Sequence, residues 1–459
     1  MTWTAAELAT IVDGALFADE GLAITGVSTD SREVSPGDCF VALVGEQFDG
    51  ADFAFDAMAS GASLIIAERR LEQPCIVVGN ALDALAAIAR DHAATLPDLR
   101  VIAITGSSGK TSTKDLVAQV LERAGATVAP VGSFNNDIGL PRTVLRADER
   151  TRFLVLEMGM RGPGQIARLC SIAPPDVAVV LNVGSAHVGE TGSREATANA
   201  KGEILTALHA DGIGIVNRDD AFASLHRSLV PGRSLEFGID GGDVHASDIR
   251  LDALARASFT LHIGGTAAPV SLRLLGEHHI ANALATAAIA SACGMTTAEI
   301  AQALSDATTR NPGRMEHVEL PNGVTLIDDS YNANPESMRS ALRALAAMGQ
   351  GRRTWAVLGE MHELGSERLM EHDAIGRLAV RLDISHLVAV GSAGKLMHIA
   401  AANEGSWGDE AAHVPDAAAA AAYVIERWRP GDIVLVKASH SEHLERVAQA
   451  LRAAAARED

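Results

Sequence analysis

The feature that most constrains this chain is a short apolar run that stops at a Gly-rich turn. It is the stretch VIAITGSSGKTSTK at residues 101–114. The β-branched residues of the run are typical of a buried parallel strand, and Gly106 and Gly109 let the backbone curl so that its N–H groups point inward. The polar segment at residues 110–125 predicts a helix. The stretch therefore predicts a strand, a phosphate-binding loop and a helix, in that order.

This loop predicts a site for a nucleoside triphosphate. The N-terminal N–H groups and positive end of the helix attract phosphate oxygens. We expect Lys110 to reach the outer phosphates and the Thr111 hydroxyl to ligate the accompanying magnesium. The longer GxxxxGK[ST] pattern is incomplete, because Ile104 occupies the place of its first glycine. An ordinary strand-to-helix turn with a surface lysine is the structural alternative.

Length and composition predict a soluble protein of several domains. A chain of 459 residues is too long for one core, so two to four domains are expected. The first residues include Glu7 and Asp13 and lack the basic segment of a signal peptide. No apolar run approaches membrane-spanning length. We therefore expect a cytoplasmic protein, without membrane insertion, and a monomer.

Charge and cysteine usage exclude further classes. The formal net charge of -20 disfavours a nucleic-acid partner, whose phosphates need a basic face. The four cysteines are scattered singly, which argues against a disulfide framework and a Cys-based zinc site. We expect all four to be buried apolar residues: Cys39, Cys75, Cys170 and Cys293.

Composition shifts predict an α/β fold of three domains. Residues 1–95 contain short strand signals and close with a helix at 82–95. Residues 96–310 alternate strands with helical segments, which predicts a mostly parallel sheet wrapped by helices. Residues 311–459 repeat this alternation and predict a second doubly wound, Rossmann-like unit. The predicted strands of the last two blocks are 153–156, 177–181, 213–216, 324–327, 355–358, 387–390 and 433–436.

Two side chains follow strands of the central block. Glu157 comes directly after one strand, and His187 lies in the loop after the next. The carboxyl ends of parallel strands share one edge, so both are expected beside the phosphate loop. Glu157 offers a carboxylate to magnesium, and His187 a neutral imidazole to a second metal or a hydrogen bond to the reacting phosphate. A merely solvated loop histidine is the alternative.

Two other polar segments stand in this block. Lys201 is expected near the start of a helix, where bound magnesium would repel its charge, so it either faces an anionic ligand or is chemically altered. The alternative is a solvent-facing helix lysine. The loop at residues 133–141, with Asn135 and Asn136, is dense in amides. It either holds polar groups of a substrate or forms a structural turn.

Taken together, these motifs resemble the ATP-dependent Mur ligases of peptidoglycan synthesis. The resemblance covers essentially the whole chain. It rests on several motifs in the family's order: TGSSGKTSTK at 105–114, SFNNDIGLP at 133–141, LEMGMRGPGQI at 156–166, NVGSAHVGETGS at 182–193, AKGEI at 200–204, LLGEHHIANALA from 274, NPGRME from 311 and DDSYNANPES from 328. Dispersed motifs in a fixed order are far more specific than any one alone.

The resemblance implies a nucleotide and metal site between the second and third domains. It implies that Lys110, His187 and Lys201 are catalytic, and that Lys201 matches a lysine that is carbamylated in this superfamily. The implied metal ligands for Mg²⁺ are Thr111, Glu157, His187 and Lys201. The implied ATP-binding residues are Gly106, Ser107, Ser108, Gly109, Lys110, Thr111, Ser112, His278, Asn282, Arg314 and Asp329.

The resemblance also implies two substrates. The segments SFNN, LEMG and DDSYNANP are most similar to the family member that joins D-alanyl-D-alanine to UDP-N-acetylmuramoyl-tripeptide through an acyl phosphate. The first domain would hold the UDP end, and the third would select the amine. The expected substrate-binding residues are Thr29, Ser31, Arg32, Gly45, Asp49, Asn135, Asn136, Tyr331, Asn332 and Asn334.

Two positions depart from the family pattern. His279 stands where asparagine is usual, which is expected to change little. The segment at residues 438–440, Ala-Ser-His, replaces a commoner Gly-Ser-Arg and puts the local contacts of the amine pocket in doubt.

Three other functions compete with this one. Two are other amide ligases of the superfamily, a folylpolyglutamate synthase and the Mur ligase that adds the third residue. The third block lacks the DNPR-type segment expected of the latter. The third competitor is a nucleotide-gated switch or transport ATPase, which would leave the first and third domains without a function.

Overall fold

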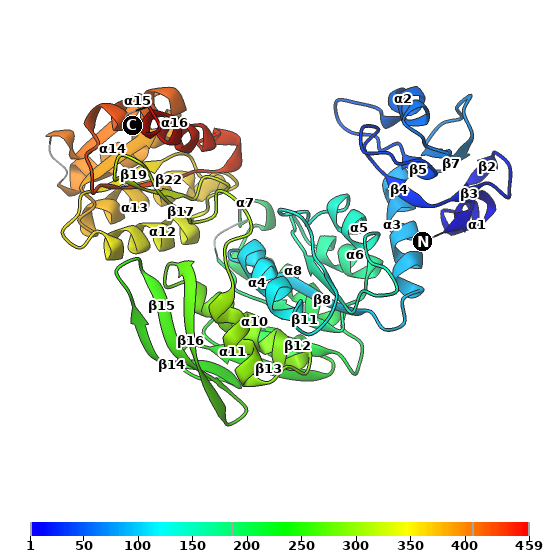
Figure 1. Ribbon diagram of the computed structural model, residues 1–459, viewed down its shortest axis with the longest axis horizontal. Helices are drawn as coiled ribbons and strands as arrows, with labels where there is room; N and C mark the ends of the chain where they lie inside the picture. The colour runs from blue at the N-terminus through cyan, green and yellow to red at the C-terminus, as the bar shows by residue number, and fades with distance from the viewer. Residues whose placement is uncertain (1, 185–187, 406–407, 458–459) are drawn as a thin grey trace.

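The computed structural model describes residues 2–184, 188–405 and 408–457. Three α/β units follow one another along the chain. Figure 1 shows the N-terminal and C-terminal units at opposite ends of the molecule, with the central unit below and between them. The predicted three-domain α/β architecture is confirmed.

The N-terminal unit is built on a five-stranded sheet with the order β2-β7-β6-β5-β4. Strands β4 to β7 are parallel, and β2 pairs antiparallel with β7. Its strands are β1 (Trp3–Thr4), β2 (Ala15–Phe17), β3 (Ala23–Ile24), β4 (Gly26–Ser28), β5 (Asp38–Val41), β6 (Leu64–Ala67) and β7 (Cys75–Val77). Its helices are α1 (Ala5–Ile11), η1 (Gly50–Phe53), α2 (Ala54–Ala59) and α3 (Ala81–Ala94).

The central unit has a nine-stranded sheet with the order β16-β15-β14-β13-β12-β11-β8-β10-β9. Neighbouring strands are parallel along the sheet order from β9 through β10, β8, β11, β12 and β13 to β14. Strands β14, β15 and β16 form an antiparallel meander. Its strands are β8 (Arg100–Thr105), β9 (Thr127–Val128), β10 (Phe153–Glu157), β11 (Val177–Val180), β12 (Ile213–Asn217), β13 (Arg233–Gly238), β14 (Val244–Leu251), β15 (Arg256–Ile263) and β16 (Thr266–Leu275).

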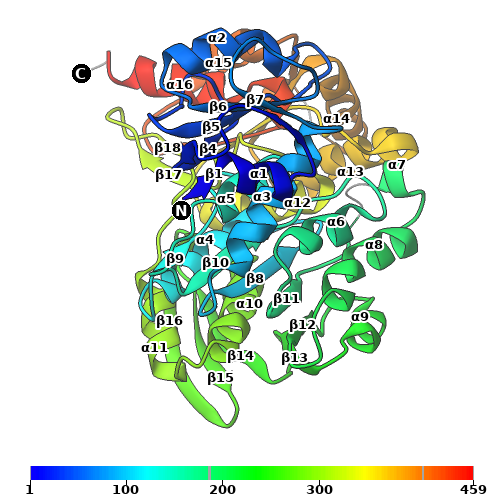
Figure 2. The same ribbon diagram turned by 90° about the vertical axis from the view of Figure 1, so that its right-hand side faces the viewer.

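Helices cover both faces of the central sheet (Figure 2). Leu116 and Val120 of the helix after the phosphate loop pack in one hydrophobic core, and Leu169 and Ile204 pack in the core on the other face. The helices are α4 (Lys110–Leu121), α5 (Gly139–Val144), α6 (Gln165–Ile172), α7 (Val188–Thr191), α8 (Arg194–Thr206), α9 (Ala223–Leu229), α10 (His279–Ala292) and α11 (Thr297–Asp306).

The C-terminal unit is a six-stranded sheet with the order β17-β18-β22-β19-β20-β21, parallel except for β17. Its strands are β17 (Glu316–Glu319), β18 (Thr325–Asp328), β19 (Thr354–Leu358), β20 (His386–Val390), β21 (Ala411–Val414) and β22 (Ile433–Lys437). Its helices are α12 (Pro335–Met348), η2 (Gly365–Glu367), α13 (Arg368–Arg381), α14 (Gly391–Glu404), η3 (Gly408–Glu410), α15 (Ala417–Arg427), η4 (His440–Glu442) and α16 (Glu445–Ala455).

Several sequence predictions are corrected in detail. Helix α4 ends at Leu121 rather than at residue 125, and Lys201 lies in the second half of α8 rather than near its start. The antiparallel meander was not anticipated by the prediction of a mostly parallel sheet. The predicted burial of all four cysteines is confirmed.

The units meet at two junctions. One hydrophobic core runs from Ile66 and Leu85 of the N-terminal unit to Leu140 and Leu156 of the central unit. Between the central and C-terminal units, Gly189 lies against the backbone of Gly365, so that a Cβ at Gly189 would stand 2.9 Å from the Gly365 nitrogen. The first junction is a shared core. The second combines this backbone contact, which only glycine permits, with a core in which Ala255 and Leu275 of the central unit pack with the C-terminal unit.

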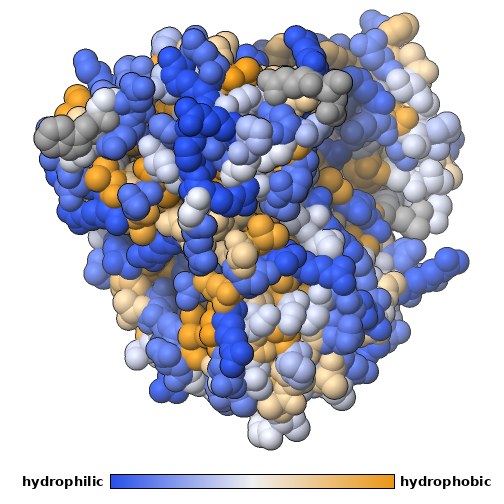
Figure 3. Space-filling model, turned by 60° about the vertical axis from the view of Figure 1, so that its left-hand side comes forward, coloured by the Kyte–Doolittle hydropathy of each residue, from blue (hydrophilic) through white to orange (hydrophobic). Residues whose placement is uncertain are grey.

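Helix composition and one face of the surface bear on whether the chain contacts a membrane. Within the described ranges, none of the helices combines the length and the apolar composition that crossing a membrane requires. On the face drawn in Figure 3, hydrophobic residues occur in small groups among hydrophilic ones.

Candidate active site

The predicted phosphate loop joins β8 to α4 and is tightly packed. Gly109 has a φ of +80°, and a Cβ there would stand 2.7 Å from Oδ1 of Asn282. Two loop N–H groups are held by one asparagine: the Ser107 nitrogen donates to the Asn182 carbonyl at 3.0 Å, and the Ser108 nitrogen to its Oδ1 at 2.9 Å. Because α4 begins at Lys110, its N-terminal N–H groups stand at this loop.

The loop forms one wall of a cavity of about 290 Å³ between the central and C-terminal units. Residues from both units meet in it, and most of the predicted nucleotide site is among them. The lining includes Ser107, Ser108, Gly109, Lys110, Thr111, Ser112, Asn135, Glu157, His278, Asn282, Arg314, Asp329, Tyr331, Asn332 and Asn334. The sequence prediction that these segments share a sheet edge agrees with this arrangement.

Glu157 ends β10 and is buried in the cavity wall. Its Oε1 accepts a hydrogen bond from Nδ2 of Asn135 at 2.7 Å. Its Oε2 is also buried and has no hydrogen-bond donor among the described residues. A buried carboxylate oxygen without a donor is costly unless a cation meets it, so this atom fits a metal ligand.

Lys110 stands opposite this carboxylate. Its Nζ donates to the Gly106 carbonyl at 2.8 Å. Burial lowers the pKa of Lys110, the charge of Arg314 lowers it further, and Glu157 and Glu363 oppose the shift. The ammonium therefore points back into the loop, where phosphate oxygens would add further charge-assisted hydrogen bonds.

A histidine pair forms one side of the cavity and includes His278, which the family resemblance assigns to ATP binding. The rings of His278 and His279 lie 4.3 Å apart between centroids. Burial lowers the pKa of His278 to about 4, with Asp329 opposing the shift and Lys437 adding to it. Nδ1 of His278 is buried and lacks a partner within the part of the chain that the structure describes. A neutral imidazole with a free nitrogen is thus available to a ligand.

Arg314 and Tyr331 of the C-terminal unit line the cavity opposite the phosphate-loop side. The guanidinium carbon of Arg314 lies 4.2 Å from the centre of the Tyr331 ring, and the Tyr331 hydroxyl contacts Oγ of Ser133. Nε of Arg314 is buried and meets no acceptor in the described ranges. An unpaired guanidinium N–H is suited to a phosphate or ribose oxygen.

Sequence reasoning missed two residues of this site. Lys437 is buried at the end of β22, and its Nζ pairs with Oδ2 of Asp329 at 2.6 Å. Asn182 holds the phosphate loop, as described above. The signal for both was their position, since each lies at or directly after the carboxyl end of a strand.

Asn332 and Asn334, predicted to select the amine, have other contacts. Oδ1 of Asn334 caps α12 by accepting from the Ser337 nitrogen at 2.8 Å, and its Nδ2 donates to the Ser107 carbonyl at 3.2 Å. The Asn332 carbonyl accepts from Nζ of Lys437 at 2.9 Å. Asn334 is therefore a helix cap that also touches the phosphate loop, and its role in selecting the amine stays a prediction.

Lys201 is not the solvent-facing lysine of the alternative interpretation, because it is 1% exposed. Burial lowers the pKa of Lys201 well below its ordinary value, and the charge of Lys110 adds to this. Both effects favour the neutral amine over the ammonium at this position. His187, the other predicted catalytic residue, lies outside the described residues.

The loops predicted to bind the UDP end lie in the N-terminal unit, apart from this cavity. Thr29, Ser31 and Arg32 follow β4, and Gly45 and Asp49 follow β5. These strands are parallel neighbours, so both loops share one sheet edge. The structure thus brings the five residues to one region.

Asn136, also predicted to hold substrate, serves the turn before α5. Its Oδ1 accepts from the nitrogens of Ile138 at 3.2 Å and Gly139 at 2.8 Å. Next to it, Arg142 of α5 pairs with Glu33 of the N-terminal unit at 2.6 Å. Oδ1 of Asn136 thus has a structural role in this turn, and its predicted role in substrate binding stays a prediction, while Asn135 positions Glu157.

Comparisons with known proteins agree across the chain. Three family models match: "Mur ligase family, catalytic domain" at residues 23–106, "Mur ligase middle domain" at 104–290 and "Mur ligase, glutamate ligase domain" at 313–440. A UDP-N-acetylmuramoyl-tripeptide–D-alanyl-D-alanine ligase of Mycobacterium bovis is 45% identical, over 98% of this chain and 97% of the relative. The Escherichia coli ligase of the same name is 35% identical, over 98% of both chains.

Solved structures show the same similarity. A crystal structure of MurF from Acinetobacter baumannii superposes with a TM-score of 0.90 at 33% identity, covering 99% of both chains. MurF ligase from Thermotoga maritima, solved in complex with ADP, superposes with a TM-score of 0.82 at 30% identity, covering 95% of this chain and 98% of that one.

Proposed function

Because this chain belongs to the Mur ligase family, we propose that it joins D-alanyl-D-alanine to UDP-N-acetylmuramoyl-tripeptide, using ATP, in peptidoglycan synthesis. The observation that carries the proposal is the cavity between the central and C-terminal units. Buried polar atoms of Glu157, His278 and Arg314 face it without partners among the described residues. An acceptor, a neutral imidazole and a guanidinium N–H together suit a metal-bound nucleotide.

The residues of the cavity suggest how the first step proceeds. The terminal carboxylate of the tripeptide attacks the γ-phosphate of ATP, and the product is an acyl phosphate and ADP. Lys110 and the N-terminus of α4 stabilise charge on the transferring phosphoryl group, and Arg314 and Asp329 close over the nucleotide from the C-terminal unit. The second step is attack of the amine on the acyl carbon, which releases phosphate.

The residues also fit the magnesium that the family implies. Thr111 and Glu157 would hold it, together with His187 and a carbamylated Lys201, and the donor-free Oε2 of Glu157 supports this set. When bound, magnesium neutralises charge on the phosphates.

The proposed division of labour follows the three units. Residues 1–95 hold the UDP end through the loops after β4 and β5, residues 96–310 bind ATP, and residues 311–459 bring the amine. The C-terminal unit closes over the acyl phosphate to exclude water, which would otherwise hydrolyse it. The cytoplasmic location, the monomeric state and the absence of a nucleic-acid partner stay predictions.

Mass spectrometry of the products tests this function. Incubation with ATP, UDP-N-acetylmuramoyl-tripeptide and D-alanyl-D-alanine is expected to give ADP, phosphate and the UDP-linked pentapeptide. Reactions lacking one substrate serve as controls. Rapid ATP turnover with neither the UDP substrate nor the amine would support a switch or transport ATPase instead.

We expect Lys201 to be carbamylated. Its pKa is lowered by burial, and a neutral amine is the form that reacts with carbon dioxide. The reaction converts a cation that repels magnesium into a carboxylate-like ligand that attracts it. Carbon-13 NMR of the protein equilibrated with labelled bicarbonate should show one carbamate signal, which is lost in Lys201→Arg. A signal that persists in this variant, or no signal in the wild type with ADP and magnesium, contradicts the expectation.

A further inference from the structure

The chain that joins the central unit to the C-terminal unit lies along α4, the helix that begins at the phosphate loop. It is residues 307–315, between the end of α11 and the start of β17, and is called here the linker. Two side chains of α4 and the residue that caps its C-terminus hold the linker: Asp115, Gln119 and Glu122. Their spacing of four and three residues puts them on one face of the helix. The path of the linker is therefore set by α4.

Two of these side chains anchor the first half of the linker. Nε2 of Gln119 donates to the Thr308 carbonyl at 2.9 Å, and its Oε1 accepts from the Thr308 nitrogen at 3.0 Å. The two terminal nitrogens of Arg310 donate to the two carboxylate oxygens of Glu122, at 2.7 Å and 2.5 Å. Because each contact consists of two hydrogen bonds, the first half of the linker is anchored without help from Asp115.

The third contact lies next to the nucleotide cavity. Oδ2 of Asp115 accepts a hydrogen bond from Nδ2 of Asn311, which precedes Arg314 by three residues. The gap between α4 and the linker is only about 20 Å³, and Arg314 lines both this gap and the nucleotide cavity. A gap of that size has room for about one water molecule. Asn311 therefore fixes the backbone directly before Arg314 enters the cavity.

Asp115 also belongs to a buried ion pair. Its Oδ1 accepts from Nζ of Lys114 at 2.5 Å, and this lysine, which is 1% exposed, also donates to the Pro130 carbonyl at 3.0 Å. Taking two charges out of water costs about as much as their attraction returns. The pair therefore gives this part of α4 a fixed geometry rather than much net stability. It holds the linker on one side and the loop that begins at Pro130 on the other.

The loop and the linker segment meet again across the cavity. The Tyr331 hydroxyl contacts Oγ of Ser133, and the guanidinium carbon of Arg314 lies 4.2 Å from the centre of the Tyr331 ring. Together these contacts close a ring that passes through Lys114, Pro130, Ser133, Tyr331, Arg314, Asn311 and Asp115. The ring ties the cavity side of the C-terminal unit to α4, one turn after Lys110.

We propose that Asp115 and Asn311 are positioning residues, which hold Arg314 in the orientation in which its guanidinium meets the nucleotide. The proposal rests on the ATP site of the function proposed above. Among the described residues that line the cavity, neither Asp115 nor Asn311 is found, so both act through Arg314. Nε of Arg314 meets no acceptor in the described ranges. The guanidinium is therefore aligned through its backbone and the Tyr331 ring, and a linker free to shift would misplace it.

Isothermal titration with ADP in the presence of magnesium tests the proposal without any catalysis. Asn311→Ala removes the hydrogen bond to Asp115 and leaves both anchors of the first half of the linker in place. We expect the Kd for ADP to rise about 10-fold, while the melting temperature of the nucleotide-free protein stays unchanged. Asn311→Asp keeps the shape of the side chain but turns a negative charge toward Asp115. It should weaken ADP binding at least as much.

A double-mutant cycle separates a role through Arg314 from any other. Arg314→Ala alone should raise the Kd for ADP about 30-fold, because it removes charge-assisted hydrogen bonds. Adding Asn311→Ala to Arg314→Ala should cause no further loss, since the group that Asn311 positions is then gone. If the two losses instead multiply, Asn311 affects the nucleotide by another route, and the proposal is overturned.

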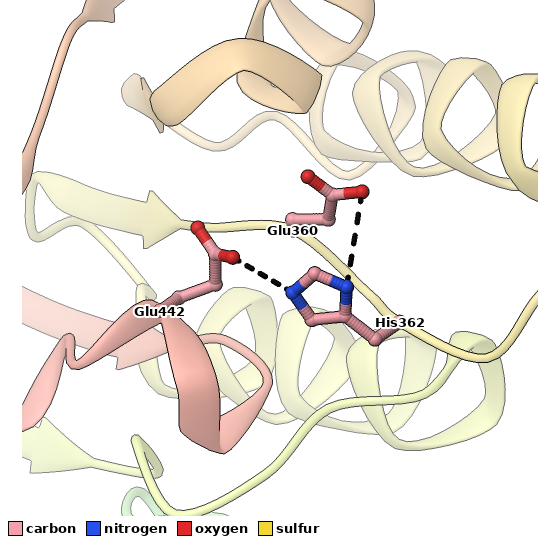
Figure 4. A group of neighbouring side chains, drawn as sticks. All are labelled: Glu360, His362 and Glu442. Atoms are coloured by element: carbon pink, nitrogen blue, oxygen red, sulfur yellow. Dashed lines mark hydrogen bonds and ion pairs between the residues drawn. The ribbon is translucent and has the colours of Figure 1, made fainter.

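Two variants serve as controls. Arg123→Ala removes an ion pair of 2.8 Å between the chain just after α4 and Asp306 of α11, before the linker begins. His362→Gln changes a polar side chain of the C-terminal unit. His362 lies between Glu360 and Glu442 (Figure 4), and none of the three is among the described residues that line the cavity. Both variants should bind ADP as the wild type does.

The remaining outcomes also decide. An unchanged Kd in Asn311→Ala overturns the proposal. So does a large fall in its melting temperature with equal losses of ADP and UDP-substrate binding, which marks a merely structural residue. A wild-type protein that does not bind ADP would overturn both the ATP site and this proposal. By contrast, a protein that gives the expected titrations but forms no pentapeptide would refute the ligase function and leave the positioning role standing.

Discussion

Lys110→Ala is expected to lower the rate of ligation by about 1,000-fold or more while the protein stays folded. The lysine lines the cavity wall, and its ammonium donates a hydrogen bond to the carbonyl of Gly106 at 2.8 Å. The ammonium faces the cavity residues and not a hydrophobic core, so its loss is expected to leave the fold intact. It does remove the cation that stabilises charge on the transferring phosphoryl group. The loss of such a cation typically lowers the rate of phosphoryl transfer by several orders of magnitude. Steady-state kinetics of ADP formation measures the effect.

The control for this variant is Lys395→Ala on α14. Lys395 is exposed and lies outside the cavity, so its removal should change neither the rate nor the melting temperature. Circular dichroism of Lys110→Ala should match the wild type. If Lys110→Ala formed ADP at the wild-type rate, Lys110 would have no role in phosphoryl transfer.

Glu157→Ala is expected to lower the rate by about 100-fold or more and to raise the magnesium concentration needed for half-maximal rate. The reason is the donor-free Oε2, which is the atom placed to meet a cation. The Michaelis constant for magnesium, measured at saturating ATP, checks this. Asn135→Ala should show a weaker form of the same defect, because Nδ2 of Asn135 orients the carboxylate at 2.7 Å.

Glu195→Ala provides the comparison for that variant. Glu195 is an exposed acidic residue in the first turn of α8, so the substitution removes one negative charge without changing the cavity. Its magnesium dependence should equal that of the wild type. If Glu157→Ala instead unfolds at a much lower temperature and binds magnesium normally when folded, the residue is structural.

The phosphate loop and its surroundings could be predicted from the sequence because their signals are local. A β-branched run, two glycines and a lysine within ten residues define the strand, loop and helix without any distant contact. The edge rule for parallel sheets then places Glu157 near that loop. The same rule also selects Lys437, which directly follows the predicted strand 433–436, but the prediction did not apply it to the third domain.

Other features depend on pairings that sequence does not display. Asp329 and Lys437 are far apart in the chain, so their ion pair is visible only after the C-terminal sheet has formed. The antiparallel meander of β14 to β16 has half-exposed strands with a register shift at Ser247, and such strands lack the continuous apolar run of a parallel strand. Burial of Lys201 depends on the packing of α8 and could not be read from its polar neighbours.

One missed role did have a local signal. Asn334 precedes Pro335 and is followed three positions later by Ser337, the spacing of a residue that caps a helix and receives a bond in return. The segment could therefore have been interpreted as the start of α12 before it was considered for substrate recognition.

The hydrophobic core that runs from the N-terminal into the central unit has a consequence for how the protein loses its structure. Residues such as Leu85 and Leu140 belong to the same apolar cluster, so neither side can melt without exposing the other to water. The first two units should therefore unfold as one cooperative body. The C-terminal unit has one core of its own and a second that takes in only Ala255 and Leu275 of the central unit, so it can open with less exposure of the other units. A UDP ligand bound to the first unit would then raise the thermal stability of the ATP-binding unit as well.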